Sequence, residues 1–167
     1  MIEALPAAQT TSMIDLDTTF LPVAQMRQIS RVTRIQDATI SGEMDLESDH
    51  WVWSQHFPTD PIFPGSLLIE AAGQIVALWA WAQGARGRPR LVRTGAEFHN
   101  PVDRWTPGLR LTSHVRKKRH LYFGSVQIWS GETLVATVDA VLVVLDSQPC
   151  SPPSSTVSSI SYAPPNG

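Results

Sequence analysis

Cysteine is nearly absent from this chain of 167 residues, in which Cys150 is the only one. A single thiol cannot form an internal disulfide, and it provides no Cys-x-x-Cys spacing for a zinc site. Such sparse use of cysteine is typical of a reducing compartment. The first 19 residues also lack a basic start and a long apolar run, so we expect no signal peptide and a cytoplasmic protein.

Neither sign of charge dominates the chain, and long hydrophobic runs are missing from it. The formal net charge is -2, which does not suit a nucleic-acid-binding protein. The most apolar window, Leu67 to Ala82, is interrupted by Glu70 and Gln74 and is shorter than the ~20 residues of a membrane span. We therefore interpret this window as a buried helix, and we expect neither nucleic acid nor a membrane as a partner.

Regular patterning is weak at both ends of the chain. Residues 147–167 hold seven Ser and five Pro, a composition that cannot build a packed core and predicts a disordered tail. Residues 1–19 are also weakly patterned and are interpreted as an N-terminal extension. Hydrophobic residues make up 43% of the chain, enough for one folded domain, which we place at residues 20–146.

The hydrophobic pattern of this domain changes from strand to helix and back again. Residues 28–46 alternate irregularly and are rich in β-branched residues, which predicts two strands. Residues 66–83 are apolar on nearly every face and lack proline, as expected of a helix enclosed by other structure. Strands separated by short turns, and hence an antiparallel meander, are predicted afterwards at 91–100, 109–118, 121–130 and 133–145.

The pattern as a whole predicts an α+β domain in which an antiparallel sheet wraps around one long central helix. Ser66 or Gly65 could cap the start of this helix, and Gly84 could end it. Gly73 lowers the helix propensity, and we expect it to permit close packing.

Three features of residues 55–74 point to acid–base chemistry. His56 directly precedes Phe57 and Pro58, so a rigid loop fixes the direction of a side chain suited to proton abstraction near neutral pH. Gly65 follows a proline at a helix N-terminus, where unpaired N–H groups can polarise a carbonyl. Glu70 lies in an apolar helix without a cation at i±4, a setting in which a carboxyl group can act as a general acid.

Each of these features also has a simpler interpretation. A histidine among prolines is often a structural loop residue. A glutamate in an apolar helix often faces solvent or a partner chain. The combination of His56, the helix start and Glu70 within one segment favours an enzyme, but it does not establish one.

The segment HFPTDPIFPGSLLIEAAGQ, residues 56–74, closely resembles the active-site segment of the 3-hydroxyacyl-acyl-carrier-protein dehydratases of type II fatty-acid synthesis. That family's pattern is roughly HFPGxPxxPGxLxxEAxAQ. A weaker resemblance runs from about residue 20 to residue 145 and includes GAEFHNPV and Pro107–Gly108. The segment matches the pattern at the same spacing at His56, Phe57, Pro58, Pro61, Pro64, Gly65, Leu67, Glu70, Ala71 and Gln74.

The resemblance implies a hotdog fold and a homodimer, with higher assembly possible, in which each site takes its histidine and its carboxylate from different protomers. His56 would remove the proton from C2 of the substrate, and Glu70 of the second protomer would protonate the departing 3-hydroxyl group. The thioester oxygen would be bound at Gly65 and Ser66, and Gln74 would support Glu70. The product would be a trans-2-enoyl thioester, formed without a metal or a dissociable cofactor.

The chain departs from the family pattern at Gln55 and Thr59, where glycine is usual, and at Leu109, where aspartate is common. These changes retain the catalytic pair but put the housekeeping substrate in doubt. The six tryptophans fit ordinary core and dimer packing, or else an acyl pocket shaped for an unusual chain in a polyketide or other specialised pathway.

Basic residues form two clusters in the sequence: Arg86, Arg88, Arg90 and Arg93, followed by Arg116, Lys117, Lys118 and Arg119. Because acyl carrier proteins are acidic, complementary charge could steer their docking at the second cluster, hereafter the 116–119 cluster. Two solvated turns would give the same pattern.

Three alternatives to dehydration remain open. A hotdog thioesterase would use the same helix N-terminus but would activate water. An enoyl isomerase would use the same acid–base pair. A non-catalytic acyl-binding subunit would retain only the fold, although a site without catalytic activity has no chemical need for His56 and Glu70.

Overall fold

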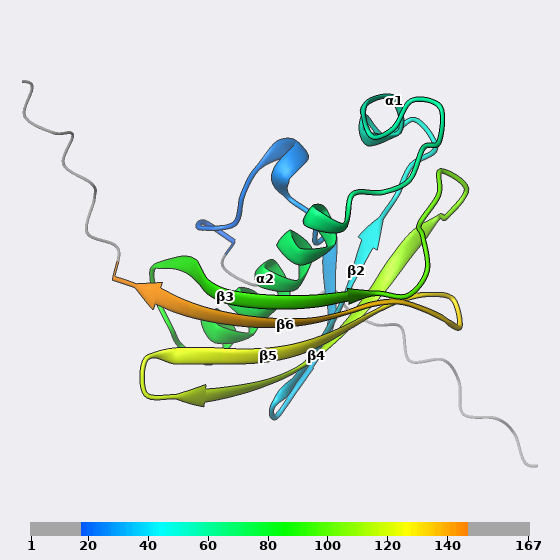
Figure 1. Ribbon diagram of the computed structural model, residues 1–167. Helices are drawn as coiled ribbons and strands as arrows, with labels where there is room; N and C mark the ends of the chain where they lie inside the picture. Colours follow the sequence, from blue (N-terminus) through cyan, green and yellow to red (C-terminus); the bar gives the residue numbers. More distant parts are fainter. Residues whose placement is uncertain (1–17, 147–167) are drawn as a thin grey trace, which may run out of the picture.

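A six-stranded antiparallel sheet and one long helix make up most of the computed structural model, which describes residues 18–146 (Figure 1). The predicted tail at 147–167 and all but the last two residues of the predicted N-terminal extension at 1–19 lie outside the described residues. The elements follow in the order η1 (Ala24–Met26), β1 (Arg31–Gln36), β2 (Thr39–Asp45), α1 (Val52–Gln55), α2 (Gly65–Ala82), β3 (Arg88–Phe98), β4 (Gly108–Lys118), β5 (Leu121–Ser130) and β6 (Thr133–Leu145).

The strands lie in the order β1-β2-β4-β5-β6-β3. Strands β4, β5 and β6 form the predicted meander, but β3 pairs with β6 rather than with β4. The prediction that the strands after the helix form one continuous meander was therefore wrong. Since α2 crosses the sheet before β3 begins, the chain enters β3 at the far edge and returns to β4 through residues 99–107.

Side-chain alternation explains why β4 and β5 form strands with one covered face. Residues 109, 111, 113 and 115 of β4 are buried, and the residues between them are more exposed. Strand β5 alternates in the same way. Successive side chains of a strand point to opposite faces, so each strand places one set of residues against α2 and the other on the outer surface.

Helix α2 begins and ends at backbone features rather than at side-chain caps. Pro64 is the N-cap and makes no side-chain capping bond, so the prediction that Ser66 or Gly65 caps the helix was wrong. At the other end, Gly84 has a φ angle of +91°. Its N–H donates to the carbonyl oxygen of Trp81, and the N–H of Ala85 donates to the carbonyl oxygen of Ala80. This is a Schellman motif, which confirms that Gly84 ends the helix.

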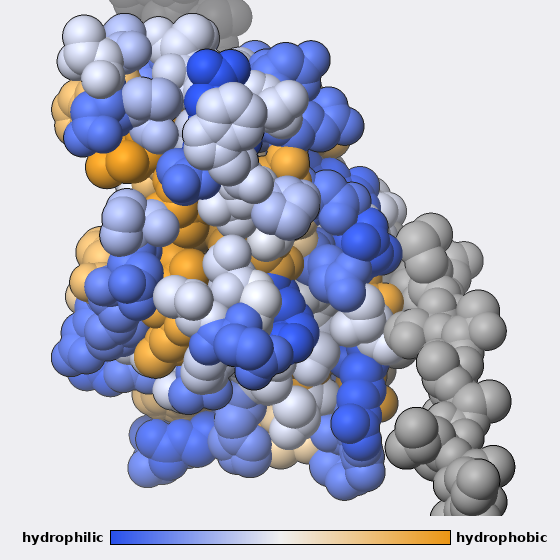
Figure 2. Space-filling model, turned by 90° about the vertical axis from the view of Figure 1, so that its right-hand side faces the viewer, coloured by the Kyte–Doolittle hydropathy of each residue, from blue (hydrophilic) through white to orange (hydrophobic). Residues whose placement is uncertain are grey.

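Most of α2 is buried against the inner face of the sheet. By length and composition alone α2 could cross a membrane, but 67% of it is buried inside the protein, as in a core helix. The face seen from the right-hand side of Figure 1 shows hydrophobic residues in a recess between hydrophilic ones (Figure 2).

Glycines bring the helix and the sheet close together. A Cβ atom at Gly42 would lie 2.7 Å from Cδ1 of Ile75, and one at Gly124 would overlap Cγ2 of Val76. Gly73 has no such role, because a Cβ atom there would meet nothing within 4 Å. The expectation that Gly73 permits close packing was therefore wrong, and this glycine faces open space.

Candidate active site

His56 is held by the loop that joins α1 to α2. It is the C-cap of α1, its ring lies 4.2 Å from that of Phe57, and its Nδ1 lies 3.1 Å from the carbonyl oxygen of Ile62. A carbonyl oxygen only accepts hydrogen bonds, so in the neutral ring Nδ1 carries the proton. The lone pair of Nε2 then remains available to accept a proton from another molecule.

The N-terminus of α2 presents backbone donors next to this loop. The N–H of Leu67 donates to Pro64 at 3.0 Å, whereas the N–H groups of Gly65 and Ser66 make no hydrogen bond within residues 18–146. The ring of Phe98 lies so close to Gly65 that a Cβ atom there would be 2.7 Å from Cζ. A Cβ atom at position 65 would therefore displace the ring of Phe98, and the N–H groups of Gly65 and Ser66 remain free for a ligand oxygen.

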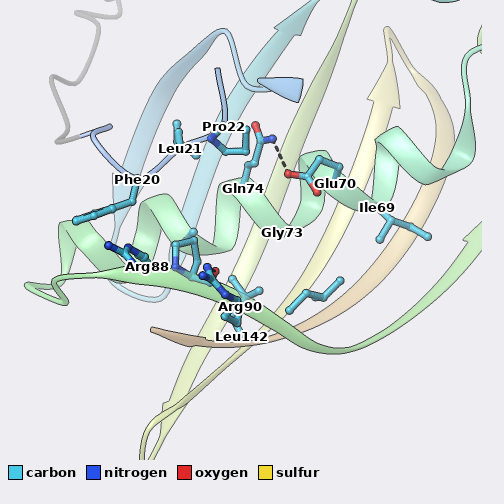
Figure 3. Close-up of a pocket in the computed structure, with 13 residues that line it drawn as sticks. Phe20, Leu21, Pro22, Ile69, Glu70, Gly73, Gln74, Arg88, Arg90 and Leu142 are labelled. Carbon is cyan, nitrogen blue, oxygen red and sulfur yellow. Dashed lines mark hydrogen bonds between the residues drawn. The ribbon is translucent and has the colours of Figure 1, made fainter. Parts of the chain in front are cut away.

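Glu70 is partly buried and is bound by Gln74 one turn later in the helix. Nε2 of Gln74 donates to Oε1 of Glu70 at 2.9 Å (Figure 3) and to the carbonyl oxygen of Met26 at 2.7 Å. Oε1 of Gln74 accepts from the backbone N–H groups of Gln28 at 2.8 Å and Ile29 at 3.2 Å. Because these backbone groups only donate, they fix the orientation of the amide and direct its NH₂ group at Glu70.

Glu70 and Gln74 line a cavity of about 310 Å³ between three segments of the chain. One wall is a face of α2, a second is the segment before η1, and a third is the start of β3 with Leu142 of β6 (Figure 3). The lining residues are Phe20, Leu21, Pro22, Ile69, Glu70, Gly73, Gln74, Ala77, Arg88, Pro89, Arg90, Leu91 and Leu142.

The fold of a single chain therefore brings Glu70 and Gln74 together in a cavity that His56 does not line. Arg88 and Arg90 do line it, although the sequence indicated them only as members of a basic cluster. Nothing in the sequence indicated that residues 20–22 would form a wall, because their contact with α2 depends on the fold.

The 116–119 cluster comprises the last three residues of β4 and the first residue of the turn to β5, and its four residues are exposed. Arg119 adopts φ +58 in the turn. Arg116 lies over the ring of Phe123 at 5.1 Å, and Lys117 lies over that of Tyr122 at 5.4 Å. None of the four lines the Glu70 cavity.

The tryptophans pack into the core or lie on the surface, and none of the six lines the Glu70 cavity. Nε1 of Trp79 donates to Asp37, Nε1 of Trp81 to Gly87 and Nε1 of Trp53 to Glu47. These contacts favour the packing interpretation over an acyl pocket built from tryptophan.

Comparison with protein families gives a match to the FabA-like domain over residues 21–139. The chain belongs to the FabA-like domain family. This membership and the sheet around a central helix show the hotdog fold that the sequence resemblance implied.

Solved structures with the same fold include enzymes of more than one kind. The dehydratase heterocomplex ApeI:P from Xenorhabdus doucetiae matches with a TM-score of 0.67 at 14% identity, covering 81% of this chain and 94% of that one. A thioesterase from Staphylococcus aureus matches with a TM-score of 0.56 at 11% identity, covering 68% and 90%. AziG from S. sahachiroi matches with a TM-score of 0.55 at 18% identity, covering 69% and 90%. At these identities the likeness shows the fold alone.

Proposed function

We propose that this protein dehydrates 3-hydroxyacyl thioesters to trans-2-enoyl thioesters. The observation that carries the proposal is the oriented pair of Glu70 and Gln74 in a cavity, on the helix whose N-terminus offers two free N–H groups. His56, whose Nε2 is available, supplies the base. These residues lie on the spacing of the dehydratase pattern.

In the proposed reaction the thioester oxygen binds to the N–H groups of Gly65 and Ser66. Nε2 of His56 removes a proton from C2, and enolate character develops on the oxygen that these N–H groups hold. Glu70 gives its proton to the 3-hydroxyl group as the C3–O bond breaks, and water leaves. Because Oε1 of Glu70 accepts from Gln74, the proton to be transferred resides on Oε2.

We further propose that each site is completed by a second copy of the chain. The absence of His56 from the lining of the Glu70 cavity supports a site shared between protomers. Edge strand β3 supports an interface, because Leu91, Val92 and Phe98 on it are 46%, 58% and 54% exposed. Pairing between the two β3 edges would cover these apolar side chains and satisfy the unpaired backbone groups.

An acyl carrier protein as the donor of the thioester remains a proposal, with the 116–119 cluster as its docking surface. The exposed positive charge at the end of the sheet supports steering of an acidic partner. A cytoplasmic location likewise stays a prediction from cysteine usage.

A thioesterase is the second candidate, since a thioesterase shares the fold. It would bind the thioester oxygen at the same N–H groups but would direct water at the carbonyl carbon and release a free acid. His56 and Glu70 are separated in the sequence as in the dehydratase pattern, and this favours loss of water over hydrolysis. Isomerisation of the enoyl product, or acyl binding without catalysis, would use the same cavity.

Mass spectrometry of carrier-bound 3-hydroxyacyl substrates distinguishes these reactions. We expect the wild type to remove water from the bound acyl group, and we expect His56→Ala and Glu70→Gln each to lower the rate by about 10²–10⁴-fold. Release of the free acid, with the carrier returned unloaded, would instead identify a thioesterase. No reaction over a series of chain lengths would contradict both enzymatic assignments.

A further inference from the structure

One wall of the Glu70 cavity is formed by a residue without a side chain. Gly73 lies on the same face of α2 as Ile69, Glu70 and Ala77, all of which line the cavity. A Cβ atom at Gly73 would find no neighbour within 4 Å. The cavity therefore continues past Glu70 along the helix at position 73, where a larger side chain would have room to enter it. Glycine leaves this space open, although it weakens the helix by about 1 kcal/mol relative to alanine.

The chemistry of this part of the cavity suits a hydrocarbon chain. Phe20, Leu21, Pro22, Ile69, Ala77, Leu91 and Leu142 make most of its walls apolar. The amide of Gln74 is already engaged at both its oxygen and its nitrogen. A pantetheine arm carries two amide groups that need partners, whereas an acyl tail needs none, so the tail fits this space better.

We propose that Gly73 determines which acyl chains the enzyme accepts, by keeping open the space that receives the tail beyond C3. The inference rests on the proposed function, in which Glu70 protonates the 3-hydroxyl group and so fixes C3 beside the helix. The cavity next to Glu70 is lined further along the helix by Gly73 and Ala77, so the tail beyond C3 would run past these two residues. A bulky side chain at position 73 would occupy the path of the tail and would hinder a long tail more than a short one.

The test compares Gly73→Ala, Gly73→Leu and Gly73→Phe with the wild type. Alanine adds one methyl group in free space and serves as the matched control for helix propensity, whereas leucine and phenylalanine fill the cavity increasingly. Urea denaturation verifies that each variant folds. Two readouts are measured over acyl chains of increasing length: kcat/KM for dehydration of carrier-bound 3-hydroxyacyl groups, and calorimetric Kd for unreactive acyl-pantetheine amides.

We expect Gly73→Leu to lower kcat/KM for the longer acyl chains by about tenfold or more relative to the shortest chain. In Gly73→Phe, kcat/KM should begin to fall at a still shorter chain length. Gly73→Ala should leave the length profile near that of the wild type. The amides should show the same shift in Kd.

Each remaining outcome is decisive. A length profile unchanged in Gly73→Leu and Gly73→Phe would overturn the inference while leaving dehydration intact. An equal loss at every chain length would overturn it as well, because the space would then hold the pantetheine arm. If the wild type binds long amides without dehydrating any substrate and Gly73→Leu no longer binds them, the length determinant stands and the proposed reaction fails. Failure of the wild type to bind any amide would overturn the inference.

Discussion

At the scale of single residues, Gln74 connects the general acid to a distant part of the chain. It is 3% exposed, and its side-chain amide binds Glu70 as well as backbone groups of Met26, Gln28 and Ile29. The segment around residues 26–29 and the carboxyl group of Glu70 are thus positioned by one side chain. Loss of this amide should affect both stability and the geometry of the site.

Gln74→Leu should lower the free energy of unfolding by about 1–3 kcal/mol, because it leaves buried backbone donors without their acceptor. It should also reduce kcat, since Glu70 loses the donor that orients it. Gln83→Leu, at an exposed position just after the same helix, is the matched control and should change stability by less than about 0.5 kcal/mol. Equal stability of the two variants in urea denaturation would contradict the role assigned to Gln74.

We expect His50 to make the stability of the folded chain depend on pH. Burial among the rings of Trp51, Trp53 and Phe63 lowers the pKa of His50 below its usual value, against the opposing effect of Glu47 and Asp49. The imidazole of His50 therefore binds a proton more readily in the unfolded chain than in the folded chain, and its protonation favours unfolding. This contribution to stability is complete above a pH of about 6.5 and is lost as the pH falls below it.

The His50→Gln variant isolates this contribution from those of the other titrating groups. Between pH 7.5 and pH 5.5, the free energy of unfolding should fall less in His50→Gln than in the wild type. Urea midpoints at the two pH values measure both changes. A variant that loses as much stability as the wild type would show that His50 takes no part.

The residue types of the site could be predicted from a short segment, but their contacts could not. The spacing of His56, Glu70 and Gln74 indicated the chemistry, and the hydrogen bond between Gln74 and Glu70 follows from one turn of helix. The bonds that Gln74 makes with Gln28 and Ile29 join residues 46 and 45 positions apart, so they depend on tertiary structure. The same reason explains why the sequence did not indicate Arg88 or Arg90 as cavity residues.

At the scale of elements, hydrophobic periodicity predicted α2 and all six strands to within a few residues. The order of the strands in the sheet could not be predicted in the same way, because hydrophobic periodicity does not indicate which strands pair. The predicted strand at 91–100 begins at Arg88 and pairs with β6. The short helix α1 was also not predicted, since its four residues are too few to show a period.

Helix α2 and strand β5 approach each other closely at Val76 and Gly124. Gly124→Ala should lower the free energy of unfolding by about 1–3 kcal/mol, because the new methyl group would overlap Cγ2 of Val76. Val76→Ala removes that atom, so it should cost less stability in the Gly124→Ala background than in the wild type. Strict additivity in this double-mutant cycle, measured by urea denaturation, would contradict the close approach.

At the scale of the whole molecule, edge strand β3 leaves large apolar side chains exposed in a single chain. Val92 is 58% exposed on β3, and a lysine there would place a charge in an apolar interface. We expect Val92→Lys to shift the protein from dimer to monomer in light scattering coupled to size-exclusion chromatography, and to lower activity with it. Val23→Lys, at a residue 79% exposed outside the sheet, is the control and should remain dimeric.

Subunit complementation tests whether His56 of one protomer and Glu70 of another form one dehydratase site, as we propose. Inactive His56→Ala and Glu70→Gln subunits are unfolded together, refolded as a mixture and assayed by mass spectrometry for loss of water from a carrier-bound 3-hydroxyacyl group. In a mixed dimer one of the two sites has both residues intact, so random pairing should restore about a quarter of the wild-type activity. A mixture that contains mixed dimers but dehydrates no faster than either variant alone would contradict the shared site.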